Sequence, residues 1–477
     1  MKVSSKAVVM RLPAIILTGL ALFWATGIMP AADISTCSKY LLLDSRVVEK
    51  ADGVALRLGQ VEKDRRNPLF AEDKPWEVRF DNMYPNVMFD GEDGIYKCWY
   101  SPFIIDKTTS TATEEIKKQM TYCKALKHQR EMALCYATSK DGIVWDKPEL
   151  GICDFDGSKQ NNIVKRNVHG AGVFKDPHES NPQRRYKMFL ERGGMSVCFS
   201  PDGLHWSDVI PCAKIKAAGD CHNNAFWDEK TKRYVGITRL WAGPRVVGRT
   251  ESRDFTDWSQ AKVVFRGLEP HLQIYTMPVF RYGDVYLGLP MIFNTKTDQV
   301  DCELAWSPDT IDWERICAGR PFIPRGQKGS YDSGCIYAAA YPILHEGKIR
   351  IYYGGNDAEH CNWRKGYLCL ARMRVDGFAG MDPLKLDKPG TIVTRPIRCT
   401  GEQLRVSVDA DGGSLRVAVL DADGLSLEKC RPITADVTDG VVRWDGVTDL
   451  GSLRGKDIRL KFELKNAKLY AFTFDGS

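Results

Sequence analysis

Four acidic residues stand in polar phrases that open or flank strand-like runs, and they are the first candidates for chemistry. They are Asp81, Asp176, Asp220 and Glu269. Carboxylates held close together repel, which raises the pKa of at least one of them, so that one can act as an acid while another acts as a base. Cleavage of a glycosidic bond requires such a pair. We therefore predict that these acids are catalytic if the fold gathers them around one axis.

Other polar residues occupy equivalent or adjacent positions, and we expect them to bind the substrate. They are Asn82, Lys175, His222, Asn223, His271, Tyr275 and Asp332. A local role stays open for several of these positions, since Asp176 and Asp332 precede turn-forming residues and Asp81 could begin a bulge. Asp357 and Arg364 flank a later loop and are a further candidate pair, for a substrate carboxylate or sulfate.

Metal-ligand spacing is absent from the sequence. No HxH or HxxxH partner accompanies His222, and the fifteen cysteines include no CxxC pair. We expect neither a metal ion nor another cofactor. The odd number of cysteines leaves at least one thiol free or paired with another chain, and those in strand-like runs are expected to be small buried hydrophobes.

A repeated phrase indicates the elements that must position these residues. Ser, Asp and Trp recur in the four segments 139–145, 200–206, 252–258 and 307–313, and the Trp-to-Trp steps are 61, 52 and 55 residues (206−145, 258−206, 313−258). In each copy Ser and Asp should accept bonds from nearby backbone, while Gly takes the positive-φ position. A period of about fifty residues with one aromatic per unit is typical of a β-propeller.

The chain divides into four predicted parts. Residues 1–32 are expected to be a signal peptide, 33–78 a lead-in that packs on the propeller, 79–382 a five-bladed β-propeller, and 383–477 a small β-sandwich. The sandwich is predicted from aliphatic residues at every second position between Asp/Gly turns. A polar insertion at 104–130 should carry a short helix, at 114–126, outside the core. The expected fold class is all-β.

The N-terminal sequence and the net charge indicate where the protein is located and which partners it can bind. A basic start precedes Leu12–Met29, eighteen residues without a charge, which predicts export to the periplasm or beyond. The alternative is an uncleaved membrane anchor, since this length is near the lower limit for spanning a bilayer. Net charge is +6, or +3 without Lys2, Lys6 and Arg11 (6−3). With no basic stripe, we expect a carbohydrate partner and no nucleic acid.

This layout resembles the five-bladed propeller glycosidases related to invertases, levanases and arabinanases, particularly glycoside hydrolase family 32, in which a β-sandwich follows the propeller. The resemblance implies that Asp81 is the nucleophile. It implies that Asp176, within the phrase Phe-Lys-Asp-Pro, stabilises the transition state, and that Asp220, followed by Cys, is the general acid.

The sequence departs from the family pattern at each of these motifs. The first phrase lacks the Asp-Pro-Asn-Gly of the family, Lys175 replaces an arginine, and Asp220 is shorter than the family's Glu by one methylene. Glu269 or Glu191 is therefore an alternative acid.

Three hypotheses follow from the sequence. The leading one is an exported glycoside hydrolase that acts on an oligo- or polysaccharide through a carboxylate pair. The second is a carbohydrate-binding propeller without catalysis. The third is a phosphorylase or lyase on the same scaffold, and phosphorolysis would be favoured by Lys175 together with Arg or His neighbours in a phosphate site.

Overall fold

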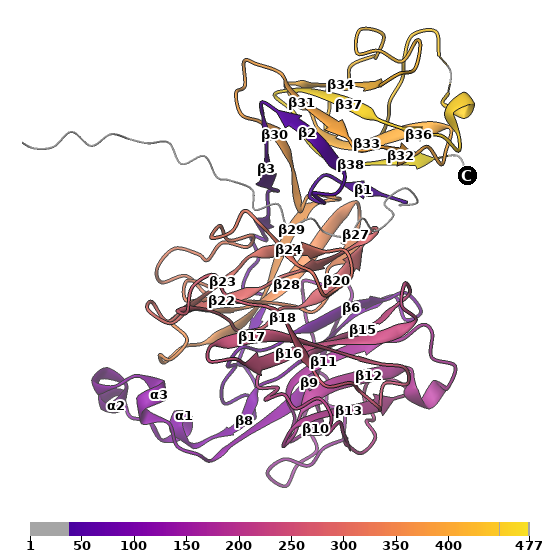
Figure 1. Cartoon of the computed structure of the whole chain (residues 1–477). Helices are drawn as coiled ribbons and strands as arrows, with labels where there is room; N and C mark the ends of the chain where they lie inside the picture. The colour runs from indigo at the N-terminus through magenta and orange to yellow at the C-terminus, as the bar shows by residue number, and fades with distance from the viewer. Residues whose placement is uncertain (1–37, 448, 476–477) are drawn as a thin grey trace, which may run out of the picture. The chain divides into compact units, whose positions relative to one another are not determined.

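The computed structural model describes residues 38–447 and 449–475, and most of its regular structure is β-strand (Figure 1). The all-β prediction is confirmed. The predicted signal peptide at 1–32 lies outside the described residues. Within the described part of the chain, no helix has the length and apolarity needed to cross a membrane.

Three consecutive sheets are built alike, each from four antiparallel strands that are neighbours in the sequence. The first contains β6 (Asn86–Asp90), β7 (Ile95–Tyr100), β9 (Arg130–Ser139) and β10 (Ile163–Arg166), with β8 (Phe103–Asp106) also paired to β9. The second contains β11 (His169–Lys175), β12 (Tyr186–Glu191), β13 (Met195–Ser200) and β14 (Ile210–Pro211). The third contains β15 (Asn224–Asp228), β16 (Arg233–Trp241), β17 (Arg245–Ser252) and β18 (Lys262–Phe265).

Two further sheets follow, and the last is larger than a four-stranded blade. The fourth contains β20 (Val279–Tyr282), β21 (Val285–Gly288), β24 (Leu304–Ser307) and β25 (Glu314–Ile316). The fifth has nine strands: β26 (Cys335–Ala338), β27 (Ile343–His345), β28 (Lys348–Asn356), β29 (Gly366–Arg374), β4 (Glu62–Lys63), β5 (Phe70–Ala71), β19 (Leu272–Ile274), β22 (Met291–Asn294) and β23 (Gln299–Cys302). Because β23 joins it through a parallel pairing with β26, the sheets do not divide into equal blades. The number of blades stays a prediction.

The repeated Ser/Asp/Trp phrases form one turn four times. In each copy the Ser hydroxyl accepts from the backbone N–H three residues on, at 2.8 to 3.0 Å, and one Asp oxygen accepts from two later N–H groups. The residue directly after the Asp has positive φ, as at Gly142 (74°) and Gly203 (79°). Trp258 is buried against Phe189 of the preceding sheet, with ring centroids 4.9 Å apart. The prediction that these phrases are structural turns is confirmed.

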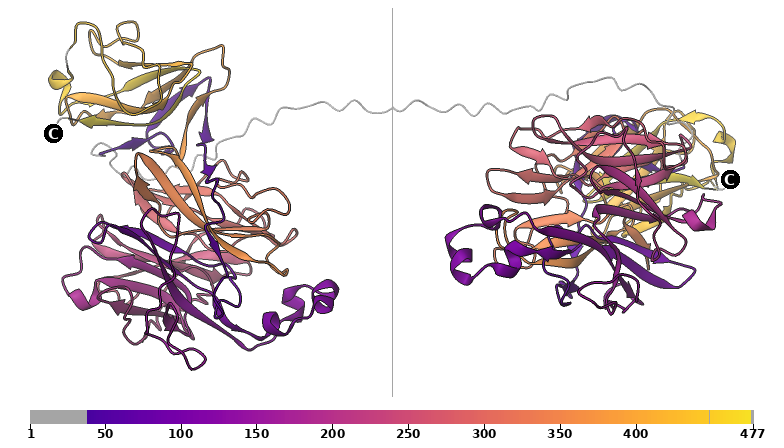
Figure 2. Two further views of the ribbon diagram at one scale, coloured as in Figure 1. Left: turned by 180° about the vertical axis from the view of Figure 1, so that it is seen from behind. Right: turned by 90° about the horizontal axis from the view of Figure 1, so that it is seen from below.

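The C-terminal strands form two further sheets that enclose their own apolar core (Figure 2). One sheet contains β1 (Tyr40–Leu41), β3 (Val54–Leu58), β30 (Ala379–Pro383), β33 (Gln403–Asp409), β35 (Val437–Val441) and β38 (Lys468–Asp475). The other contains β2 (Val48–Asp52), β31 (Gly390–Thr394), β34 (Ser414–Val419) and β37 (Leu460–Lys465), and β32 (Ile397–Arg398) pairs with β36 (Asp457–Ile458).

The predicted lead-in at 33–78 differs from the structure. Its first strands, β1 to β3, pair with β38, β31 and β30 of the C-terminal sheets, and only β4 and β5 pair with β29. The segment therefore has no single place on the propeller. Short alternating strands pair wherever a sheet edge has an open ladder, and one sequence does not reveal which edge that is.

The insertion contains three short helices, α1 (Lys107–Thr111), α2 (Glu114–Gln119) and α3 (Tyr122–Ala125). Asp106 caps α1 by accepting from Thr108 and Thr109, and Thr113 caps α2. These caps satisfy backbone N–H groups that have no partner within the first turn of a helix. The predicted helix at 114–126 is thus divided in two near Met120.

Candidate functional site

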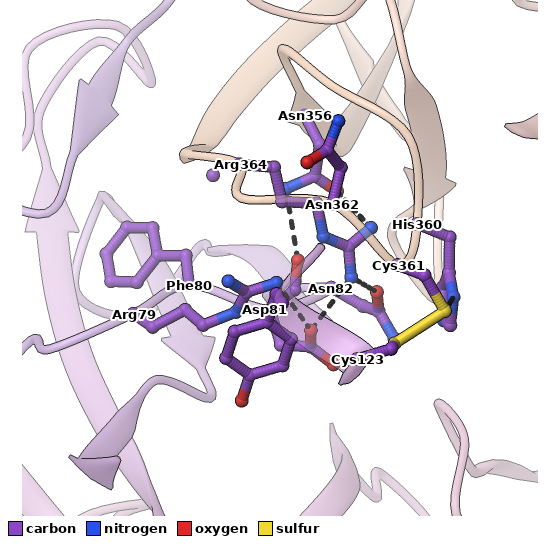
Figure 3. Close-up of polar contacts among 12 residues, drawn as sticks. Arg79, Phe80, Asp81, Asn82, Cys123, Asn356, His360, Cys361, Asn362 and Arg364 are labelled. Atoms are coloured by element: carbon purple, nitrogen blue, oxygen red, sulfur yellow. Dashed lines mark hydrogen bonds and ion pairs between the residues drawn. A yellow bond between two sulfur atoms is a disulfide. The ribbon is translucent and has the colours of Figure 1, made fainter. Parts of the chain in front are cut away.

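Asp81 lies between two arginines just before β6, as Figure 3 shows. Nη2 of Arg364 donates to its Oδ1 at 2.8 Å, and Nη2 of Arg79 lies 3.6 Å from the same oxygen. Burial raises the pKa of Asp81, but Arg364 and Arg79 more than offset this effect, so the pKa lies well below its usual range. The side chain remains 19% exposed. Asp81 is therefore an ionised carboxylate that a ligand can reach.

Neutral polar groups extend from Asp81 in a hydrogen-bonded chain. Asn82 accepts from Arg364 at 2.9 Å and donates to Tyr84 at 2.7 Å and to Tyr275 at 3.0 Å. The Tyr275 hydroxyl also lies 3.1 Å from Nε2 of His360. Burial, then Asp220 and Asp81, raise the pKa of Tyr275 to about 12. Two carboxylates, from the loops before β6 and β15, thus raise the pKa of one hydroxyl.

The insertion is fastened to the loop that carries His360 and Arg364. A disulfide joins Cys123 to Cys361 across 238 residues, with Cα atoms 5.1 Å apart. Nε1 of Trp363 donates to the Met120 carbonyl at 2.8 Å. The guanidinium of Arg79 lies 3.7 Å above the ring of Tyr122 on α3. Far from being peripheral, the insertion helps to hold both arginines that flank Asp81.

A second carboxyl group stands on the other side of His360. Asp298, in the turn between β22 and β23, accepts from the Cys361 N–H at 2.6 Å, and its Oδ1 lies 3.9 Å from Nδ1 of His360. Its side chain is 32% exposed. Burial raises the pKa of Asp298, whereas burial and then Arg364 lower the pKa of His360 to about 3. Asp298 and Asp81 are shifted in opposite directions around one neutral imidazole.

Asp298, His360 and Cys361 also offer donor atoms within 4.8 Å of one another, the spacing of a metal site. The sulfur of Cys361 is bonded to that of Cys123. Because a disulfide sulfur is not the thiolate that a metal requires, this group does not form a three-ligand site while the disulfide is intact.

Asp220 is on the same side of the sheets as Asp81 but is much more exposed, at 61%. It accepts from Nη2 of Arg239 at 2.6 Å, and its other oxygen lies 3.3 Å from Nε2 of His169. The hairpin of β16 and β17 supplies Arg239, Trp241 and Arg245. Both guanidiniums lie over the Tyr275 ring, at 5.3 and 5.7 Å from its centroid.

His222 and Asn223 have local roles in the turn before β15. Nε2 of His222 lies 3.1 Å from Oδ1 of Asn86, and burial lowers its pKa to about 3, so the ring is neutral. Asn223 donates to three carbonyls, including those of Gly170 and Gly219, and accepts from Thr238. His222 packs beside Tyr84 with ring centroids 5.5 Å apart, so it supports the tyrosine rather than facing a ligand.

Asp176 and Lys175 lie at the other end of β11. Asp176 is fully buried, accepts from Tyr234 at 2.6 Å, and pairs with the buried Lys187 at 2.9 Å. Lys175 pairs with Asp90 at 2.9 Å and so has a carboxylate partner instead of a free anion site. The structure does not bring Asp176 to Asp81 and Asp220.

The remaining predicted residues are also scattered. Asp332 is buried, pairs with Lys63 and accepts from Tyr353 at 2.9 Å. Glu269 is exposed in the loop before β19, and His271 contributes its carbonyl to Thr295. Neither Glu269 nor His271 has a side-chain contact with Asp81 or Asp220 among the described residues.

Three participants were not among the predicted residues: Asp298, His360 and Arg79. Asp298 and His360 stand in polar segments that look like ordinary connecting loops, and Arg79 stands between the apolar Val78 and Phe80 with no motif around it. The sequence offers only an indirect signal for them, because His360 lies four residues before Arg364, which is itself a candidate for binding an anion.

No protein-family model matches the chain, and no curated protein matches its sequence. Among solved structures, the chain is similar to an N-acetylgalactosamine deacetylase from F. plautii in complex with blood group B trisaccharide, at 16% identity and a TM-score of 0.47, covering 67% of this chain and 96% of that one. It is similar to a member of the GH130 family of mannoside phosphorylases, at 15% and 0.45, covering 66% and 94%. It is also similar to an α-L-arabinofuranosidase from Podospora anserina in complex with cellotriose, at 13% and 0.44, covering 66% and 97%.

Proposed function

We propose that the protein cleaves O-glycosyl bonds in an oligo- or polysaccharide, with Asp81 as nucleophile or base and Asp298 as general acid. The observation that carries the proposal is a pair of partly exposed carboxyl groups, Asp81 and Asp298, at the two ends of a polar chain through Asn82, Tyr275 and His360. Their pKa values are shifted in opposite directions. Such a divergence is the arrangement that lets two carboxyl groups take opposite roles at one pH. The acid role moves from Asp220 and Glu269, the sequence candidates, to Asp298.

In this mechanism the glycosidic oxygen receives both the proton and the electron pair of the bond that breaks. Asp298 donates its proton to the glycosidic oxygen as the bond to the anomeric carbon breaks. Asp81 either takes a proton from the water that attacks that carbon or attacks the carbon itself. In the second case Asp298, now ionised, takes a proton from the water that displaces Asp81 from the sugar, which restores both groups. Arg364 and Arg79 keep Asp81 ionised, because each favours its charged form. Asn82 and Tyr275 offer neutral groups for sugar hydroxyls.

The phosphorylase alternative has no support from Lys175, which is paired with Asp90. A non-catalytic carbohydrate-binding protein is the other alternative, and a hydrolysis assay separates it from the proposal. Addition of inorganic phosphate to the same assay separates phosphorolysis from hydrolysis, because the product is then a sugar phosphate.

We also propose that the protein is exported, either released or held by an N-terminal anchor. Two features support this: the basic start with its uncharged run and the Cys123–Cys361 disulfide, because disulfides persist in oxidising compartments. Fractionation of expressing cells and mass spectrometry of the N-terminus test the proposal. A mature protein that retains Met1 in the cytosolic fraction contradicts it.

The test of activity is a glycan panel assayed for new reducing ends with three proteins: wild type, Asp81→Asn and the control Asp257→Asn. Asp257 is exposed and pairs only with the exposed Lys214 among the described residues. We expect Asp81→Asn to lower the rate by about 10²–10⁴-fold and Asp257→Asn to leave it unchanged. Equal rates for wild type and Asp81→Asn remove Asp81 from the mechanism.

A further inference from the structure

The cluster around Tyr275 contains more guanidiniums than the carboxylates that pair with them. Arg79 and Arg364 both form ion pairs with Asp81, and Arg239 forms an ion pair with Asp220. A fourth guanidinium, Arg245, donates to Gln273 at 2.7 Å and has no carboxylate partner among the described residues. Arg245 is partly buried, and withdrawing a guanidinium from water without an anion beside it is unfavourable.

Arg239 and Arg245 also have unused donors. Arg239 is only 1% exposed, yet its Nε and Nη1 make no hydrogen bond, and neither does Nε of Arg245. Buried donors without an acceptor are rare in proteins. The two groups also repel: burial and then Arg239 lower the pKa of Arg245. Both observations describe a site that is complete only with an added anion.

An exposed aromatic ring borders the same guanidiniums. Trp241 is 52% exposed, and the guanidinium carbons of Arg245 and Arg239 lie 4.7 and 5.4 Å from its centroid. Indole faces stack on sugar rings, and arginine forks bind planar carboxylates and other oxyanions through paired N–H groups. A free inorganic anion would use the arginines but not the indole. The combination fits an anion that is attached to a sugar.

We propose that Arg239, Arg245 and Trp241 bind an acidic saccharide, with the guanidiniums on the oxyanion and the indole on the ring. This inference rests on the proposed glycosidase function and narrows its substrate to a sugar that carries a carboxylate or ester sulfate. The exposed Asp220 occupies one arginine and has to yield part of that contact when the ligand arrives.

Binding is tested by calorimetry on the Asp81→Asn background, where turnover does not interfere. The probes are trigalacturonate, its neutral methyl ester and inorganic phosphate, and the variants are Arg245→Gln, Arg245→Lys and the control Arg249→Gln. Arg249 is on the same strand, β17, but its guanidinium bonds Thr310 and Glu251. Thermal unfolding of every variant shows whether the loss is local.

We expect the acid to bind at least tenfold more tightly than its methyl ester, and we expect Arg245→Gln to abolish this preference. Arg245→Lys should retain part of it and Arg249→Gln all of it. Equal binding of acid and ester overturns the inference, and so does phosphate that binds as tightly as the acid and displaces it. If the acid binds as expected but no glycan is cleaved by wild type, the proposed function fails and the binding site stands.

Discussion

The two ends of the inner strands use the same residue types in different ways. At the ends of β6, β11 and β15, an Asp accepts from a Tyr hydroxyl of the following sheet: Tyr186 bonds Asp90, Tyr234 bonds Asp176, and Tyr286 bonds Asp228. At the starts of the strands, Asp81 and Asp220 pair with arginines that have unused donors. The tyrosines there, Tyr84 and Tyr275, accept from the neutral Asn82 instead of donating to a carboxylate.

The difference teaches how to separate structural acids from chemical ones. A carboxylate that is fully buried, paired with a lysine and bonded to the next sheet has its hydrogen-bonding capacity filled, and it ties two sheets together. Asp176 is of this kind. A carboxylate that is ionised, partly exposed and surrounded by unsatisfied donors retains capacity for a ligand, as Asp81 does. The same amino acid serves either purpose, so its surroundings decide.

Replacement of Asp298 by Asn should have the largest effect of all, in the cluster that contains Asp81 and His360. We expect cleavage of a glycoside with a poor leaving group to fall by about 10²–10⁴-fold, and an activated nitrophenyl glycoside to lose much less, because nitrophenolate departs without a proton. Because burial raises the pKa of Asp298 above its ordinary value, the wild-type rate should fall as pH rises through that raised pKa. That alkaline limb should vanish in the variant. Equal losses on both substrates would contradict the acid role.

At the opposite end, Lys187→Met should reduce stability and leave chemistry alone. Lys187 and Asp176 are fully buried, so removal of the lysine leaves a buried carboxylate without this cation. The expected cost is about 3–5 kcal/mol in the free energy of unfolding, measured by urea denaturation. Activity per folded molecule should be unchanged. A loss of kcat in the folded variant would erase the distinction between the two ends.

The repeated turns should be sensitive to a single methyl group. Gly203 has a φ of 79°, and a Cβ there would lie 2.6 Å from the Trp99 ring. We expect Gly203→Ala to lower stability by about 1–3 kcal/mol. Gly193, which has positive φ but open space around it, is the matched control and should cost less. Equal costs at both positions would show that the backbone conformation alone sets the effect.

A pair of matched substitutions sharpens the comparison further. Tyr234→Phe removes a bond to the buried Asp176 carboxylate and should cost about 1.5–3 kcal/mol of stability. Tyr275→Phe removes bonds to the neutral Asn82 and His360, so it should cost about 1 kcal/mol. Only Tyr275→Phe should lower kcat/KM. Loss of activity in Tyr234→Phe but not in Tyr275→Phe would place the chemistry at the ends of the strands, near Asp176, and would contradict the account.

Local patterns predicted much of the fold. The Ser/Asp/Trp phrases specify their own hydrogen bonds, so sequence sufficed for the turns and the all-β class. The sequence did not predict the partners of β1 to β3, because strands that pair across more than 300 residues carry no local sequence signal of that pairing. The Cys123–Cys361 disulfide was missed for the same reason, and with it the role of the insertion.

The candidate site was predicted in part. Asp81, Asn82, Asp220 and Tyr275 do lie together, since all of them stand just before inner strands. Asp176 was predicted to join them, but it lies at the opposite end of its strand. An Asp at the end of a strand and an Asp at its start stand in similar local sequences, so the sequence alone does not distinguish them. Asp298 carries no motif, and its significance comes only from burial beside His360.

Chemical rescue of Asp81→Ala tests the central claim most directly. The variant leaves a small space between the guanidiniums of Arg364 and Arg79, which added formate can fill as a substitute carboxylate. Circular dichroism should first show that the variant is folded, and chloride at equal ionic strength is the control. We predict that Asp81→Ala is inactive on the glycan that wild type cleaves and that formate, but not chloride, restores part of the rate. An Asp81→Ala variant as active as wild type without formate would contradict the account.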